Sequence, residues 1–309
     1  MRTRFRGIEV REGVLLRGAA GWGEWSPFWD YDDTECGPWL AAAREAADVG
    51  WPAPLRHLIP VNVTVPAVGP EAAAAVVAAS AGCRTAKVKV AEPGQSEGDD
   101  IARVEAVAAA LAAGGPDGRV RVDANGAWDV DTAVRRIRLL DKASGGLEYV
   151  EQPCATVEEL AAVRRKVDVP IAADESIRRA ADPLRVRELD AADIAVLKVQ
   201  PLGGVAVCLR IAEQIGLPVV VSSALETSVG IAAGLALAAA LPELPYASGL
   251  ATLSLLTGDV TANPCTVVDG ALAAVRPGVD LTAEDFPRAD AATTARWLAR
   301  LRAVNNARG

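Results

Sequence analysis

The residues of this sequence best suited to chemistry are lysines and carboxylates placed at the ends of short β-branched runs. Lys87 and Lys89 stand two positions apart in one run, so a β-strand would present both side chains on the same side. Acidic residues close the three following runs, and a further lysine stands in the next. In chain order these residues are Asp123, Glu151, Asp174 and Lys198.

Three carboxylates close together cannot all stay ionised without a compensating positive charge. Oxygen ligands without histidine or thiolate favour Mg²⁺ or Mn²⁺ as that charge. Such a cation stabilises the second negative charge that develops when the α-proton of a carboxylate leaves. A lysine beside other cations has its pKa lowered toward neutrality and can take that proton. The set therefore predicts proton abstraction α to a carboxylate, followed by elimination or reprotonation.

Each of these residues alone has a more ordinary explanation, because an acidic residue that closes a strand is usually a turn residue or a helix cap. The ordered series on five consecutive runs is much harder to obtain by accident. The sequence has one histidine, His57, near a predicted domain junction, and we interpret it as a linker or packing residue. Proton transfer would therefore depend on lysine, aspartate or glutamate rather than on a histidine triad.

Composition narrows the class of protein. The 309 residues are 51% hydrophobic and 23% charged, which is ordinary for a globular protein, and the net charge of −8 disfavours nucleic acid or an anionic membrane as main partner. Five dispersed cysteines without a C-x-x-C motif indicate reduced thiols. The longest apolar run, residues 229–241, is too short to cross a bilayer. We expect a cytoplasmic protein that acts on a small molecule, with no membrane insertion and no obligate protein partner.

The elements that must position the candidate residues are indicated by a repeating pattern. Short β-branched runs alternate with Ala- and Glu-rich segments of helical character at spacings of 23 to 34 residues, which fits one strand and one crossover helix. Eight such strands close most naturally into a barrel, with the active site at the carboxyl ends of the strands. A doubly wound open sheet is the alternative, but no G-x-G-x-x-G follows the first run. The runs begin near residues 61, 85, 119, 147, 170, 194, 217 and 246, and the predicted helices cover 71–80, 101–113, 129–140, 156–167 and 227–241.

Residues 1–58 have a different pattern. Strands are expected at residues 4–10, 14–18 and 21–25 and a helix at 39–48, which together form a separate α+β module. We expect the tail, about residues 275–309, to pack back on this module. The segment 26–38 is rich in aromatic and acidic residues. Its aromatic residues could close over a substrate or build a small core, and the sequence supports both interpretations equally.

These motifs resemble the enolase superfamily, whose sites use a lysine base and Mg²⁺ on an enediolate. Within it, the Lys-x-Lys and the later lysine are similar to the muconate-lactonising subgroup. The stretch Gly23-Glu24-Trp25-Ser26-Pro27-Phe28 and the loops most resemble the members that carry out syn dehydration of 2-succinyl-6-hydroxy-2,4-cyclohexadiene-1-carboxylate (SHCHC) in menaquinone biosynthesis. The barrel motifs that carry the resemblance are Lys87-Val88-Lys89, Val122-Asp123-Ala124-Asn125, Glu151-Gln152-Pro153, Ala173-Asp174-Glu175-Ser176 and Leu197-Lys198.

The resemblance implies an α/β fold, a (β/α)7β barrel over residues 59–274 with an N-terminal α+β capping domain over residues 1–58. It implies that Asp123, Glu151 and Asp174 hold Mg²⁺, with Mn²⁺ as the other candidate ion.

The resemblance also implies roles for the lysines and their neighbours. Lys89 would remove the α-proton and then help hydroxide to leave, Lys198 would stabilise the enolate from the opposite face, and Lys87 would tune Lys89. Asn125 and Glu175 would support the ligating side chains. Residues at the ends of strands seven and eight are candidates to contact the succinyl carboxylate, namely Ser222, Ser223 and Gly249.

Three alternatives remain open on the sequence. An N-acylamino acid racemase or a dipeptide epimerase would use the two lysines as acid and base on opposite faces. A Schiff-base aldolase would use Lys89 or Lys198 as nucleophile and would not need three carboxylates. A binding barrel without activity would leave the whole charged set unexplained.

Overall fold

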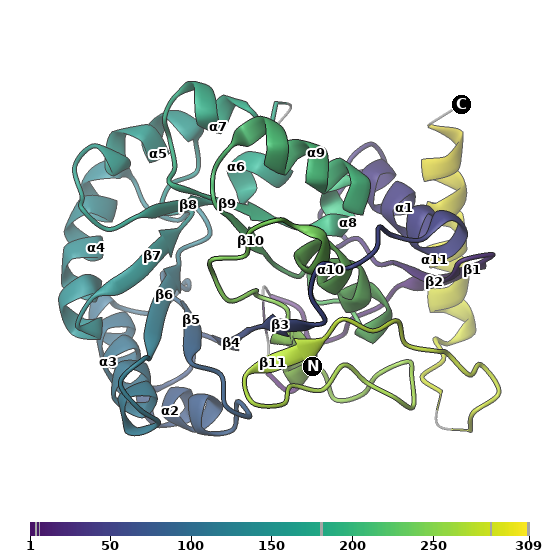
Figure 1. Cartoon of the computed structure of the whole chain (residues 1–309), viewed down its shortest axis with the longest axis horizontal. Helices are drawn as coiled ribbons and strands as arrows, with labels where there is room; N and C mark the ends of the chain where they lie inside the picture. Colours follow the sequence, from purple (N-terminus) through teal and green to yellow (C-terminus); the bar gives the residue numbers. More distant parts are fainter. Residues whose placement is uncertain (4, 6, 180–181, 285, 308–309) are drawn as a thin grey trace.

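The computed structural model describes the chain except for residues 4, 6, 180–181, 285 and 308–309. Among the described residues, seven parallel strands form one sheet in the order β10-β9-β8-β7-β6-β5-β4. Helices lie outside these strands (Figure 1). The strands are β4 (Asn62–Val65), β5 (Thr85–Lys89), β6 (Arg119–Asp123), β7 (Leu147–Glu151), β8 (Ile171–Ala173), β9 (Ile194–Leu197) and β10 (Val219–Val221).

The sheet closes through the segment predicted as its eighth strand. That prediction was wrong in form, because residues 246–250 make only single parallel bridges, Val61 with Ser248 and Ser222 with Gly249. The two bridges join the segment to the neighbourhoods of β4 and β10, the two edges of the sheet. A barrel therefore forms without a regular last strand, and the open-sheet alternative is excluded.

Local sequence explains where the crossover helices begin and end. Ser96, Asp129 and Thr156 each accept a hydrogen bond from a backbone N–H in the first turn of the helix that comes after it. Gly145 ends α4 in the left-handed conformation that glycine adopts without strain. The helices are α2 (Pro70–Ala78), α3 (Glu97–Ala113), α4 (Val130–Ser144), α5 (Val157–Arg164), α6 (Glu175–Arg178), α7 (Arg185–Glu188), α8 (Val199–Leu202), α9 (Val205–Ile215) and α10 (Ser228–Ala240).

The N-terminal module contains the hairpin of β1 (Val14–Gly18) and β2 (Gly21–Trp25), and then α1 (Cys36–Arg44), which continues as a π-helical turn (Glu45–Val49). The strand expected at residues 4–10 was wrong: its described residues make only one bridge, Phe5 with Ile8, and residues 4 and 6 lie outside the described part. A second antiparallel pairing joins β3 (Leu58–Pro60), which precedes the barrel strands in the sequence, to β11 (Ala271–Ala273), which follows them.

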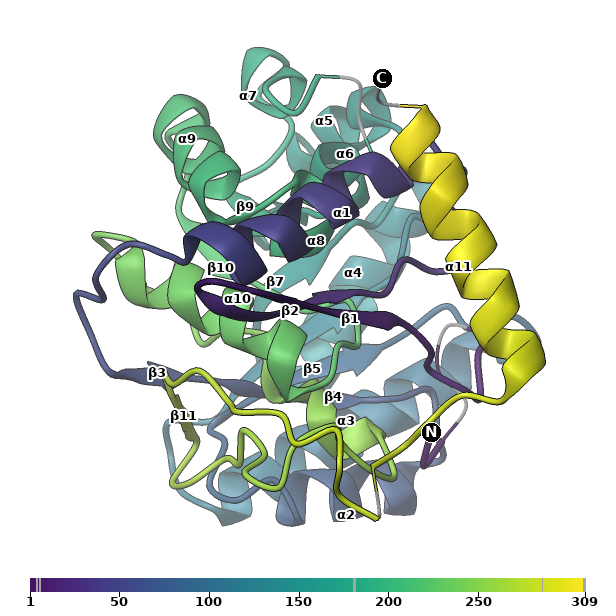
Figure 2. The ribbon, with the colours of Figure 1, turned by 90° about the vertical axis from the view of Figure 1, so that its right-hand side faces the viewer.

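The C-terminal helix α11 (Ala291–Asn306) lies against the N-terminal module, beside α1 and β1 (Figure 2). Trp297 packs edge-on against the fully buried Trp25, with ring centroids 5.4 Å apart. The buried Arg300 donates to the carbonyl oxygens of Pro27 (3.2 Å), Phe28 (2.8 Å) and Tyr31 (2.7 Å). One side chain of the tail thus fixes the backbone of the aromatic segment 26–38.

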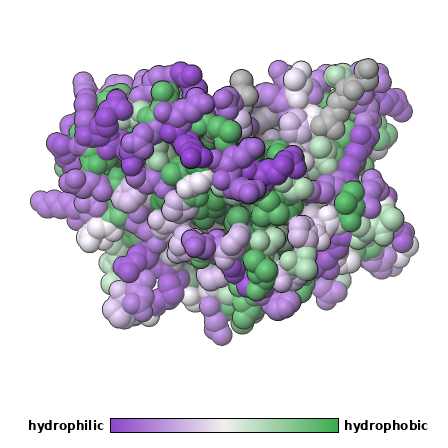
Figure 3. All heavy atoms as spheres, turned by 45° about the horizontal axis from the view of Figure 1, so that its top comes forward, coloured by the Kyte–Doolittle hydropathy of each residue, from purple (hydrophilic) through white to green (hydrophobic). Residues whose placement is uncertain are grey.

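Hydrophobic side chains fill the space between strands and helices, and α10 is buried along most of its length. Hydrophilic side chains cover most of the face in Figure 3, with hydrophobic ones visible between them near its centre. All five cysteines are buried with free thiols, as the sequence predicts. Within the described part of the chain, every helix is too short or too polar to span a membrane.

Arg300→Met removes the donor that satisfies three buried carbonyl groups. We expect this change to lower the free energy of unfolding in urea by about 2–4 kcal/mol, because three buried carbonyl groups would each lose a hydrogen bond to a charged donor. Arg302→Met, at an exposed position of the same helix, serves as the control and should change stability by less than about 0.5 kcal/mol. Equal stability of the two variants would show that Arg300 does not fix the segment.

Candidate active site

A pocket opens where the parallel strands end, and most of the residues predicted for the site line it. Lys87 and Lys89 reach it from β5, and Lys198 reaches it from the end of β9. Asn125, Ser222, Ser223 and Gly249 also line it, as predicted. Phe28, from the aromatic segment predicted either to close over a substrate or to build a small core, lines the pocket and also belongs to a hydrophobic cluster. Phe5, Thr64, Ala224, Leu225 and Thr252 also line the pocket and were not predicted, because their positions carry no motif that could mark them.

Three buried carboxylates are each held by a lysine. Lys87 Nζ donates to both carboxylate oxygens of Glu151, at 2.9 and 3.0 Å, and lies 3.4 Å from Asp123 Oδ2. Lys89 Nζ lies 2.5 Å from Asp123 Oδ2, and Lys198 Nζ lies 2.6 Å from Asp174 Oδ2. The three acidic residues are at most 1% exposed.

Strand register explains this arrangement. Lys89 is paired with Asp123 across β5 and β6, and Asp123 is paired with Glu151 across β6 and β7. Side chains at equivalent positions of neighbouring parallel strands project to the same side. Lys87, two residues earlier in β5, projects to that side as well and reaches both carboxylates.

Burial and neighbouring charges shift the pKa values of the site in different directions. The pKa of Glu151 is raised to about 7, mainly by burial and also by the charge of Asp123, against the opposing effect of Lys87. Burial would also raise the pKa of Asp123, but Lys89 and Lys87 outweigh it and the pKa is lowered. The pKa of Lys198 is lowered because the buried ammonium is poorly solvated, although Asp174 partly compensates.

The loops beyond the strands add a layer of contacts. Asn125 accepts a hydrogen bond from Lys89 Nζ at 2.6 Å and donates to Glu175 Oε1 at 3.2 Å. Gln152 receives the backbone N–H groups of Asp174 and Ser176 on its side-chain oxygen. Asn125 and Glu175 lie near the site, as predicted, whereas the contacts of Gln152, which stands directly after Glu151, were not predicted.

The carboxylates offer only hard oxygen donors, which suits a divalent cation such as Mg²⁺. In the described part of the chain, however, no three Asp, Glu, His or Cys side chains are gathered closely enough to form a ready metal site. Lysine ammonium groups instead contact all three carboxylates. The donor chemistry therefore fits a divalent cation, while the assignment of Asp123, Glu151 and Asp174 as ligands stays a prediction.

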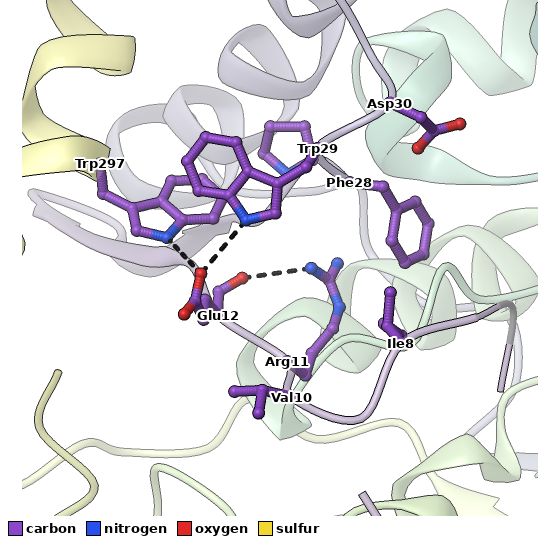
Figure 4. A pocket seen from close by; sticks show the side chains of 9 residues that line it. Ile8, Val10, Arg11, Glu12, Phe28, Trp29, Asp30 and Trp297 are labelled. Atoms are coloured by element: carbon purple, nitrogen blue, oxygen red, sulfur yellow. Dashed lines mark hydrogen bonds between the residues drawn. The ribbon is translucent and has the colours of Figure 1, made fainter. Parts of the chain in front are cut away.

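A larger hollow of about 320 Å³ is lined in part by the aromatic segment, including Phe28, Trp29 and Asp30 (Figure 4). Its wall includes Trp29 and Trp297, whose indole N–H groups both donate to Glu12 Oε2. Phe28 lines both this hollow and the site. Among the described residues, the wall of this hollow contains no lysine and no buried carboxylate, so the chemistry belongs to the smaller pocket.

Comparison with known proteins places the chain in a family. Residues 71–286 match the family described as enolase C-terminal domain-like, and residues 1–47 match the one described as enolase N-terminal domain-like. The chain belongs to the enolase superfamily. This confirms the resemblance and the fold class that the sequence motifs predict, and members of this superfamily use a divalent metal ion.

Close relatives share a single name. A protein of Thermobifida fusca (strain YX) named o-succinylbenzoate synthase is 67% identical over 307 residues, which cover 99% of this chain and 94% of the relative. One of the same name from Mycolicibacterium smegmatis is 60% identical over 279 residues, covering 90% and 84%. The solved structure of the L-Ala-D/L-Glu epimerase from Bacillus subtilis is 26% identical, with a TM-score of 0.71 over 85% of this chain and 88% of that one.

In this enolase-superfamily chain the N-terminal module also contacts the barrel beside the pocket. Glu24 of β2 accepts hydrogen bonds, both at 3.1 Å, from the backbone N–H groups of Thr227, the residue before α10, and Gly230, in its first turn. It also accepts from the hydroxyls of Thr227 (2.5 Å) and Ser26 (2.7 Å). A carboxylate from one module thus caps a helix of the other, where a negative charge is favourable.

A second buried carboxylate, Glu226, lies in the loop after Ser222 and Ser223. Glu226 Oε2 accepts a hydrogen bond from the backbone of Ala224 at 2.8 Å, and its other oxygen is buried without a hydrogen bond. The pKa of Glu226 is raised to about 7, mainly by burial and also by the nearby charge of Glu24. The folded chain therefore holds a proton on Glu226 more tightly than the unfolded chain does.

Glu226→Gln should remove a pH-dependent loss of stability. The pKa of Glu226 is raised from 4.5 to about 7 in the folded chain. Glu226 therefore lowers the free energy of unfolding progressively as the pH rises from about 4.5 to 7, and this lowering stays constant above pH 7. We expect the variant to be more stable than the wild type at pH 8, by roughly 3 kcal/mol at most, and less so at pH 5.5. Urea unfolding at both pH values measures this.

Glu213→Gln, at an exposed position, is the matched control and should show no such pH-dependent difference. A Glu226→Gln gain that is equal at pH 5.5 and pH 8 would contradict the raised pKa.

Proposed function

We propose that this chain catalyses the syn dehydration of SHCHC to 2-succinylbenzoate by way of an enediolate, a reaction of menaquinone biosynthesis. The observation that carries the proposal is a pocket that Lys89 and Lys198 both line, with Asp123, Glu151 and Asp174 buried against the lysines. Relatives named o-succinylbenzoate synthase at 67% and 60% identity support this reaction over others of the superfamily.

Lys89 acts first in this mechanism. Its neutral amine takes the α-proton of the substrate carboxylate, and the resulting ammonium then gives a proton to the hydroxide that leaves from the neighbouring ring carbon. The ring gains a double bond and becomes aromatic, and water is released. Asn125 Oδ1, 2.6 Å from Lys89 Nζ, orients the amine for both transfers.

The other two lysines supply fixed positive charge. Lys198 lies against the pocket from the opposite part of the sheet and favours the anion that forms when the proton leaves. Lys87 stays an ammonium group, because Glu151 and Asp123 raise its pKa against the effect of burial. A permanent charge at Lys87 adds to the positive charge that favours the developing anion.

We propose that Asp123, Glu151 and Asp174 hold Mg²⁺, with Mn²⁺ able to replace it. When bound, the ion supplies positive charge to the carboxylate oxygens of the substrate as the α-proton leaves. Asn125 contacts Asp123 Oδ1 through its backbone N–H at 3.0 Å, which fixes the orientation of that carboxylate.

The succinyl tail is assigned to the side of the pocket formed by Ser222, Ser223 and Gly249. The hydroxyls of Ser223 and Thr252 are 2.6 Å apart, so one of them is oriented by the other. A side chain at position 249 would begin 2.7 Å from the hydroxyl of Ser222, so glycine keeps this corner open.

The domain limits, residues 1–58 for the cap and 59–274 for the barrel, belong to the same proposal. The free buried thiols support a cytoplasmic location.

A second candidate function is racemisation of N-acylamino acids or epimerisation of dipeptides. It is favoured by the two lysines in one pocket and by the similarity to the Bacillus subtilis epimerase. The two reactions share proton abstraction and differ in the second step: hydroxide leaves in one, and a proton returns to the opposite face in the other.

Purified protein with Mg²⁺ should convert SHCHC to 2-succinylbenzoate, measured by the ultraviolet absorbance change, and EDTA should abolish turnover until Mg²⁺ is restored. Deuterium exchange into N-succinylamino acids, measured by NMR, should be slower by at least about 10-fold if dehydration is the main reaction. Exchange without dehydration would reverse the choice between the two functions.

Lys89→Ala should lower kcat for SHCHC by at least about 10³-fold, because the variant lacks both the base and the acid. Deuterium exchange at the α-carbon should be lost in parallel. Lys142→Ala, at an exposed position of α4, is the control and should retain wild-type turnover. A Lys89→Ala variant with the wild-type rate would assign the base to another residue.

A further inference from the structure

Arg178, at the end of the short helix α6, lies between the proposed active site and the aromatic segment of the N-terminal module. Its Nε donates to Asp174 Oδ1 at 2.8 Å, and its Nη2 donates to Glu175 Oε1 at 2.5 Å. Its Nη1 donates to the hydroxyl of Tyr31. The side chain is only 2% exposed, so these contacts are made away from solvent.

Each acidic partner of Arg178 leads to one of the lysines. Asp174 accepts Arg178 on one oxygen and Lys198, at 2.6 Å, on the other. Glu175 Oε1 accepts Arg178 and also Asn125, whose own oxygen accepts Lys89 at 2.6 Å. A single guanidinium group is thus connected to both lysines, through one carboxylate in the first case and through a carboxylate and an amide in the second.

Tyr31, the third partner, is fixed within its segment. Its backbone carbonyl accepts Arg300 at 2.7 Å, and its ring packs edge-on against Trp39 with centroids 5.4 Å apart. The guanidinium of Arg179 lies 4.5 Å from the ring centroid. The same segment carries Phe28 into the wall of the pocket. The position of the Tyr31 hydroxyl therefore depends on the position of this segment relative to the site.

A guanidinium group binds through a planar fork, so its contacts restrict one another: a shift of one partner reorients the group toward the others. Displacement of Tyr31 would turn the fork relative to Asp174 and Glu175. A carboxylate that ligates a metal is oriented by such hydrogen bonds, and their loss costs about 10- to 100-fold in metal affinity.

We propose that Arg178 is a positioning residue that couples the seating of the aromatic segment, through Tyr31, to the orientation of Asp174. This inference rests on the proposed function, in which Asp174 holds the divalent ion. The coupling is reciprocal by thermodynamic necessity: if the segment strengthens ion binding, ion binding stabilises the seated segment.

The test compares three conservative variants by the dissociation constant of Mn²⁺, measured by electron paramagnetic resonance without substrate. Arg178→Lys keeps the charge but loses the fork, and we expect about 10-fold weaker binding. Tyr31→Phe removes only the hydroxyl, and we expect about 3-fold weaker binding. Arg210→Lys is the control, because Arg210 is exposed on α9 and donates to the carbonyl oxygen of Ala206 in its own helix, and its Mn²⁺ affinity should stay within about 2-fold of the wild type.

Two further readouts separate coupling from a purely structural role. In the double variant Tyr31→Phe/Arg178→Lys, Mn²⁺ binding should be no weaker than in Arg178→Lys alone, because Arg178→Lys already removes the link between Tyr31 and Asp174. Addition of Mn²⁺ should slow amide hydrogen exchange in residues 27–36 of the wild type and leave it unchanged in Arg178→Lys.

Additive effects of the two substitutions, or wild-type Mn²⁺ affinity in Tyr31→Phe, would overturn the coupling. If the wild type binds Mn²⁺ and dehydrates SHCHC while Arg178→Lys matches it in Mn²⁺ affinity, the inference alone fails. If the wild type neither binds Mn²⁺ nor dehydrates SHCHC, the proposed function fails and the inference falls with it.

Discussion

Charge compensation inside the barrel is the constraint on which the rest of the structure depends. Asp123, Glu151 and Asp174 are buried at neighbouring strand ends, where unpaired carboxylates would be costly. Lys87, Lys89 and Lys198 come from strands on either side and neutralise them at distances of 2.5 to 3.0 Å. The same burial that makes these pairs necessary also raises the pKa of Glu151 and lowers that of Lys198, which gives the pocket its capacity for acid–base chemistry.

The N-terminal module completes the site instead of merely covering it. Glu24 caps α10, Arg300 of the C-terminal helix fixes the backbone that carries Phe28, and Tyr31 contacts Arg178. Each contact joins segments more than 140 residues apart in the chain. The pocket wall is therefore built by the docking of two modules, and its geometry depends on interactions that neither module contains alone.

Much of the barrel and the chemical core of the site could be predicted from the sequence, because both depend on local periodicity. The period-two pattern of Lys87 and Lys89 puts both lysines on one side of β5, and the repeated βα units bring Asp123, Glu151 and Asp174 to the same edge. Capping residues such as Ser96 and Thr156 mark helix starts through contacts three residues away. Contacts between residues only a few positions apart can be predicted from the sequence, because they depend on the order of the residues alone.

Tertiary structure alone decided the features that depend on distant contacts. The last strand is reduced to two bridges at Ser248 and Gly249, and which partners they meet depends on closure of the whole sheet. Arg178 looks like an ordinary surface residue four positions after Asp174, until folding places Tyr31 against it. The sequence by itself determined which residues carry charge and which face of a strand they share; the tertiary structure decided which charges meet, because pairing depends on three-dimensional proximity that periodicity does not encode.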